Sequence, residues 1–232
     1  MVVVNLPFRL YASTYSEFES LVGVDKSVPC HIALAFARDY DSRGNPTAGE
    51  FHPYFNITDI TPDDILKFKQ TKEHAKFFLS IGGWSEKYPF NLPTGEWVPR
   101  AVDSLKEIIR SYHFDGVDVY YQHIDASLDP NQFVEAWQET TRRLQDDIPS
   151  LETHSVSSLV PSVKQLVEKF KALRYPRVKL FAGHSILKAD WQPVPLPVFL
   201  EAIPALISEG LISGLSQWAA IGGGDPVNCD DN

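Results

Sequence analysis

Short apolar runs alternate with amphipathic stretches along the whole chain. Runs of strand length lie at residues 8–13, 31–37, 76–81, 114–121, 154–160, 178–182 and 215–219. Apolar residues at helical spacing lie between them, at residues 97–112, 131–144, 163–173 and 196–207, with a shorter stretch at 17–22. Another helix is predicted to begin at Thr61, where an N-cap threonine precedes proline and two acids. Strands alternating with helices predict a parallel sheet with helical crossovers.

The chain contains about seven such strand candidates, with no linker and no shift in composition. We therefore expect one domain over residues 1–232. Two architectures fit this order, a doubly wound sheet and a (β/α) barrel. A phosphate-binding turn is not expected, because the glycine run at residues 222–224 follows the last strand with no helix behind it.

Composition narrows the function classes. The formal net charge of -9, with no cluster of Lys and Arg, argues against a nucleic-acid partner. Residues 1–10 lack the pattern of a signal peptide, and no apolar stretch approaches membrane-spanning length. Two cysteines, Cys30 and Cys229, fit a reducing compartment, so we expect a cytoplasmic or storage location. The seven histidines share no ligand spacing, and neither a metal nor a cofactor is expected.

The fourth strand carries most of the candidate chemistry. Alternation along a strand places Gly116, Asp118, Tyr120 and Gln122 on one face and Tyr121 on the other. Polar groups that point into a barrel are costly to bury, so they either form a site or satisfy one another.

This strand resembles the fourth barrel strand of the family 18 glycoside hydrolases. The family motif Asp-Gly-x-Asp-x-Asp-x-Glu matches residues 115–122, which begin with Asp115 and Gly116. A second family signature, Ser-x-Gly-Gly, is matched by residues 80–83 at the end of the third strand. The resemblance covers nearly the whole chain and is closest to the plant branch that includes bulb chitinases, narbonin and the Rubisco-associated proteins. It implies a TIM-type (β/α) barrel.

The departures from the motif bear on activity. The resemblance implies that the final Glu protonates the glycosidic oxygen and that the Asp two residues earlier orients the acetamido group of the substrate. Gln122 and Tyr120 occupy these two positions. No intact catalytic set is therefore expected. The candidates for a substitute acid are His123, Asp125 and the loop residues Glu86 and Asp39.

The resemblance also implies a glycan cleft. The residues expected to bind a ligand there are Gly82, Gly83, Trp84, Tyr121 and Trp218. The corresponding ligand is a glycan that contains N-acetylglucosamine.

Compared with the plant branch that the chain resembles, there is room for only one helix between the fifth and sixth strands, so we expect one βα unit to be missing there. The usual last helix is also expected to be absent. The barrel is then either seven-stranded and closed or open at the missing unit, where a second chain could cover the gap. Three functional hypotheses remain open. They are a catalytically inactive protein that binds a glycan or a protein partner, a storage protein without a ligand, and a glycosidase with residual or altered activity.

Overall fold

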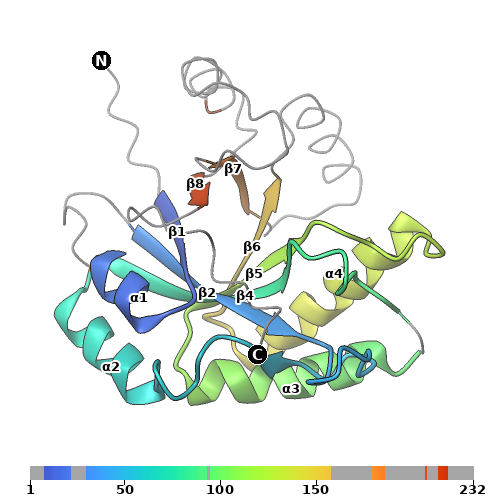
Figure 1. Ribbon diagram of the computed structural model, residues 1–232, viewed down its shortest axis with the longest axis horizontal. Helices are drawn as coiled ribbons and strands as arrows, with labels where there is room; N and C mark the ends of the chain where they lie inside the picture. The colour runs from blue at the N-terminus through green and yellow to red at the C-terminus, as the bar shows by residue number, and fades with distance from the viewer. Residues whose placement is uncertain are drawn as a thin grey trace.

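The computed structural model describes residues 8–21, 30–92, 95–157, 179–185, 207 and 214–218 (Figure 1). Seven parallel strands form its centre, and an eighth, β3 (His52–Pro53), pairs antiparallel with the end of β2. The parallel strands are β1 (Phe8–Ala12), β2 (Cys30–Arg38), β4 (Ala75–Gly83), β5 (Gly116–Tyr121), β6 (Glu152–Ser157), β7 (Lys179–Ser185) and β8 (Gly214–Trp218).

These strands close into a ring. β1 pairs with β2 on one side and with β8 on the other, and the ring continues through β7, β6, β5 and β4 back to β2. The prediction of a (β/α) barrel that is one unit short is therefore confirmed. The alternative of an open gap, where a second chain could bind, is not found, because β6 pairs directly with β7. β6 and β7 each pair with a neighbouring strand on both sides, so neither presents an open edge that a partner chain could join.

In the described part of the chain, four helices pack on the outside of the strands (Figure 1). They are α1 (Tyr15–Leu21), α2 (Pro62–Thr71), α3 (Trp97–Ser111) and α4 (Pro130–Asp147). The predicted start of α2 is confirmed, since Thr61 and Asp64 form a reciprocal capping box ahead of Pro62. The helices predicted at residues 163–173 and 196–207, except for residue 207 itself, lie outside the described residues, as does the stretch after β8 where the last helix would be.

Alternation along the strands produces two separate apolar layers. The outer layer packs the sheet against the helices and includes Phe77, Leu79 and Val117 with Trp97 and Trp137. The inner layer lies within the ring and is formed by Tyr11, Ala33, Ala35, Phe36 and Phe78. A strand covered on both faces has to be apolar on both, which explains the continuous apolar run of β2.

Candidate functional site

Asp118 is the centre of a polar cluster inside the ring. Its side chain is 0% exposed and forms an ion pair with Arg9, whose side chain is also 0% exposed. It also accepts hydrogen bonds from the Tyr11 hydroxyl at 3.0 Å and from the Ser80 hydroxyl at 2.9 Å. The four residues come from β1, β4 and β5, and Ser80 stands directly beside Asp118 in the sheet register. The carboxylate is thus held by three donors, two from β1 and one from β4.

Arg9 supplies the positive charge that makes this burial possible. Its guanidinium lies 4.6 Å from the centre of the Phe78 ring, and its Nη2 lies 3.4 Å from His31 Nδ1. Burial and the negative charge of Asp118 raise the pKa of Tyr11 well above its usual value, so Tyr11 remains a neutral donor. Sequence reasoning missed Arg9. The available signal was its position two residues before Tyr11, on the same strand face.

Tyr120 and Gln122 follow Asp118 toward the carboxyl end of β5. The Tyr120 ring packs against Tyr11 and Phe36 at centroid distances of 5.5 and 5.7 Å. Burial raises the pKa of Tyr120 to about 12. The exposed Gln122 donates through Nε2 to the Tyr120 hydroxyl at 2.6 Å. The structure therefore places Asp118 and Tyr120 on one face of β5, and Gln122, just beyond the end of the strand, bonds to Tyr120 on that side.

Asp115 and Gly116, at the start of the motif, have packing contacts. Asp115 accepts hydrogen bonds from the Phe77 backbone N–H at 2.8 Å and from Lys69 Nζ at 2.6 Å, which ties α2 to the sheet. A Cβ on Gly116 would lie 2.4 Å from both a Phe78 ring carbon and the Glu152 carbonyl oxygen. Neither residue contacts the Asp118 carboxylate through a hydrogen bond that the structure describes.

Gly82 and Gly83 shape the end of β4. Their φ angles of +97° and +136° lie in the region that favours glycine. A Cβ on Gly82 would lie 2.8 Å from the Tyr121 ring, so the close approach of β5 also requires glycine there. The bend leads to Trp84, which is partly buried and packs edge-on against Phe36 at 5.2 Å. The predicted ligand residues Gly83 and Trp84 thus adjoin the inner layer at the carboxyl end of the strands.

Tyr121 is placed differently from the prediction that it binds a ligand. It lies on the helix side of β5, where it donates to Asp39 Oδ1 at 3.1 Å and packs against Phe90 at 5.6 Å. Strand alternation sends it away from Asp118, so its position gives the ligand role no support. Trp218 is the last residue of β8 and pairs with Ser185, and its side chain lies outside the described part of the structure.

Three candidates for a substitute acid, Asp39, Asp125 and Glu86, lie away from the Asp118 cluster. Asp39 is 1% exposed, and burial raises its pKa, but it accepts hydrogen bonds from Trp97 Nε1 and Tyr121 among the outer-layer residues. Asp125 accepts hydrogen bonds from the backbone N–H and hydroxyl of Ser127, which lower its pKa. Glu86 is exposed on the loop after β4. None of the three bonds to the Asp118 cluster in the described residues.

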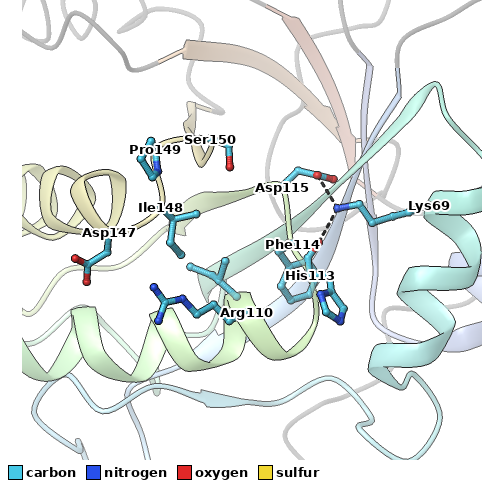
Figure 2. Close-up of a pocket in the computed structure, with 10 residues that line it drawn as sticks. Lys69, Arg110, His113, Phe114, Asp115, Asp147, Ile148, Pro149 and Ser150 are labelled. Carbon is cyan, nitrogen blue, oxygen red and sulfur yellow. Dashed lines mark hydrogen bonds and ion pairs between the residues drawn. The ribbon is translucent and has the colours of Figure 1, made fainter.

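A separate hollow of about 480 Å³ lies at the other end of β5 (Figure 2). Its lining includes Asp115, Lys69, Arg110, His113 and Asp147. The ion pair between Lys69 and Asp115 crosses one side of it. Because this hollow is at the amino end of the strand, it is distinct from the cluster around Asp118.

The described residues contain no group of three or more His, Cys, Asp or Glu side chains arranged to hold a metal ion. Among the helices they form, none is long and apolar enough to cross a membrane.

Comparisons with known proteins agree with this geometry. The sequence model of glycosyl hydrolases family 18 matches residues 17–179, which are more than half of the chain. Chitinase 1 of Tulipa saxatilis subsp. bakeri is 37% identical over 147 residues, which cover 60% of this chain and 46% of the tulip protein. The RuBisCO-associated protein of Glycine max is 29% identical over an alignment of 254 positions. The alignment covers 90% of this chain and 88% of that protein.

Solved structures show the same barrel. The family 18 chitinase of Crocus vernus superposes with a TM-score of 0.72 at 22% identity, over 92% of each chain. A chitinase from Cycas revoluta, solved in complex with (GlcNAc)3, gives a TM-score of 0.61 at 15% identity, over 93% of this chain and 95% of that one. At these identities the likeness shows the fold.

Proposed function

Because the chain belongs to the family 18 glycosyl hydrolases, we propose that it is a catalytically inactive chitinase-like protein that binds a glycan. The observation that carries this proposal is which residues stand at the acidic positions of the motif at residues 115–122 and what they contact. An amide at Gln122 replaces the acid, and Asp118 is neutralised by Arg9 inside the barrel. A chain with this arrangement keeps the scaffold and lacks the proton donor.

General acid catalysis requires a group that gives up a proton near the working pH. The Gln122 amide has no such proton, and its Nε2 is already bonded to Tyr120. Tyr120 holds a proton, but its pKa of about 12 makes it a poor donor at neutral pH. Asp118 accepts from Arg9, Tyr11 and Ser80, which leaves its carboxylate no role as a mobile partner for a substrate amide.

Glycan binding is supported by what remains at the carboxyl end of the strands. Trp84 is partly buried beside Phe36, so part of its surface is open to a ligand. Aromatic faces are the usual platforms for sugar rings in such clefts, because their apolar area stacks on the C–H face of a sugar. The Cycas revoluta chitinase of the same fold was solved with an oligomer of N-acetylglucosamine.

A storage role is the second candidate, and one observation favours it. The Tyr120 ring packs on Tyr11 and Phe36 and so fills part of the inner layer, at the motif position that the resemblance assigns to the acetamido group. A protein partner in place of a glycan is also compatible with this packing. In each case we propose a cytoplasmic or storage compartment of a plant cell as the location.

Titration with chito-oligosaccharides, following tryptophan fluorescence and product release together, tests the proposal. We expect saturable quenching without cleavage. Trp84→Phe should remove most of the quenching, while Trp97→Phe, which alters a fully buried tryptophan of the outer layer, should leave it. An active family 18 chitinase provides the positive control for product release.

The other outcomes have distinct meanings. Cleavage by the purified chain, absent in a Gln122→Ala variant, would refute inactivity and point to an acid that acts through Gln122. The absence of both quenching and cleavage would favour storage or a protein partner.

A further inference from the structure

Two Asn-x-Thr triplets occur in the sequence, and this triplet is the pattern of an acceptor for N-linked glycans. The first covers residues 45–47 and has Pro46 in the middle, and proline at that position excludes a triplet from the pattern. The second covers residues 56–58 and has Ile57 in the middle. The sequence has no Asn-x-Ser triplet, so Asn56 is the one position that fits.

The side chain of Asn56 is exposed on the loop between β3 and α2. Its Oδ1 accepts a hydrogen bond from the Thr58 backbone N–H at 3.1 Å and another from the Thr58 hydroxyl at 2.7 Å. Its Nδ2 makes no hydrogen bond within the described part of the chain. In the other triplet, by contrast, Asn45 Nδ2 donates to both carboxylate oxygens of Asp41.

The hydroxyl contact bears on the reactivity of the amide. An amide nitrogen is a poor nucleophile, because its lone pair is delocalised into the carbonyl group. A donor held at Oδ1 stabilises the negative charge that develops there as Nδ2 loses a proton. The contact between Asn56 and Thr58 spans only three residues, and such side-chain turns form locally. The arrangement therefore does not depend on the rest of the barrel.

The folded chain accommodates a bulky substituent at this loop. Phe55 and Ile60, which are 3% and 0% exposed, anchor its two ends in the core, and the four residues between them are all exposed. Ile57 is 54% exposed, which is the largest value among the large apolar side chains of the described residues. A hydrophilic glycan on Asn56 would lie beside this isoleucine and shield it.

We propose that Asn56 accepts an N-linked glycan when the chain is translocated into the secretory pathway. The donor is an oligosaccharide carried on a lipid pyrophosphate. Asn56 Nδ2 attacks the anomeric carbon of the first sugar, so that a C–N bond forms while the bond from that carbon to the pyrophosphate oxygen breaks. The lipid pyrophosphate leaves with the electron pair of the broken bond, and the amide gives up one proton to a base of the transferring enzyme.

This modification goes beyond the proposed glycan-binding function and does not require a sugar on Trp84. It does depend on the location of the chain. Of the two locations proposed above, a storage compartment that is filled through the secretory pathway is the one in which the chain would carry the glycan.

The test is cell-free translation of the full chain, behind a cleavable secretion leader, with microsomes from the endoplasmic reticulum. We expect one step of slower migration on a denaturing gel, which peptide-N-glycosidase F reverses. Protection of the product from added protease shows that the chain was translocated. An established acceptor glycoprotein in the same reaction shows that the transferring enzyme is active.

Variants then assign the shift to one side chain. Asn56→Gln should abolish it, and so should Thr58→Val, which removes the hydroxyl and keeps the shape of the side chain. Thr58→Ser should retain it, because the hydroxyl remains. Asn45→Gln is the matched control, since Asn45 is also exposed on a loop and belongs to the triplet that proline interrupts. This control should leave the shift unchanged.

Two results would overturn the proposal. One is a protease-protected chain that shows no shift while the control glycoprotein is modified, and the other is a shift that persists in Asn56→Gln. Because the microsomal reaction acts on the chain before it folds, a variant that cannot fold still gives a valid result. Titration with chito-oligosaccharides is a separate measurement, so the loss of this proposal would leave the proposed glycan binding standing.

Discussion

The ion pair between Arg9 and Asp118 predicts a large and strongly coupled effect on stability. Both side chains are 0% exposed, and Asp118 has only two other described partners, the hydroxyls of Tyr11 and Ser80. Replacing Arg9 by methionine keeps much of the side-chain volume over Phe78 and removes the charge. The carboxylate would then be left buried without a cation.

Breaking a buried pair by removing one partner costs about 3–5 kcal/mol, whereas replacing both partners by uncharged groups is often close to neutral. We therefore expect Arg9→Met to lower the free energy of unfolding by about 3–5 kcal/mol. Arg9→Met combined with Asp118→Asn should recover much of that loss, which gives a coupling energy of about 2 kcal/mol or more. With a urea slope of about 2–3 kcal/mol/M, the midpoint of Arg9→Met should fall by about 1 M or more.

Urea unfolding followed by circular dichroism at pH 7 measures all four members of the cycle. Lys76→Met is the matched control, because Lys76 is 50% exposed in an ion pair with Glu152. An exposed pair contributes about 1 kcal/mol or less, so its midpoint should barely move. Additive losses, or an Arg9→Met loss no larger than that of the control, would show that Arg9 is not needed to bury Asp118.

Two further predictions concern neighbouring positions on β5. Gly116→Ala should lower the free energy of unfolding by about 1–3 kcal/mol or more, because the new Cβ would lie 2.4 Å from a Phe78 ring carbon. Urea unfolding measures this change, and a loss below about 0.5 kcal/mol would contradict the packing. Burial raises the pKa of Tyr120 from 10.0 to about 12, so its contribution to stability is complete below pH 10 and is lost as the pH rises through 12. Tyr120→Phe should reduce the loss of stability between these pH values, and an unchanged pH profile would refute the assignment.

Much of the fold could be predicted from local patterns. The capping box at Thr61 and the apolar spacing of α3 are contained within single segments, so their boundaries followed closely. The face of β5 that carries Asp118 and Tyr120 followed from strand alternation alone. The presence of Gln122 where the family motif ends in Glu is likewise a matter of residue identity. The sequence by itself therefore determined the order of the elements, the family resemblance and the residues at the motif positions.

Only the tertiary structure showed the contacts between residues that are far apart in the sequence. Arg9 and Asp118 are 109 positions apart, and only the closed ring brings β1 opposite β5. The same closure pairs β6 with β7 and removes the gap that the missing unit had suggested. Alternation assigns Tyr121 to the other side of the strand, but its hydrogen bond to Asp39 required the end of β2 to be in place. Charge pairing in a low-dielectric interior depends on distance in space. The sequence therefore showed that Gln122 stands at the acid position, whereas only the structure showed that Arg9 is the cation paired with Asp118.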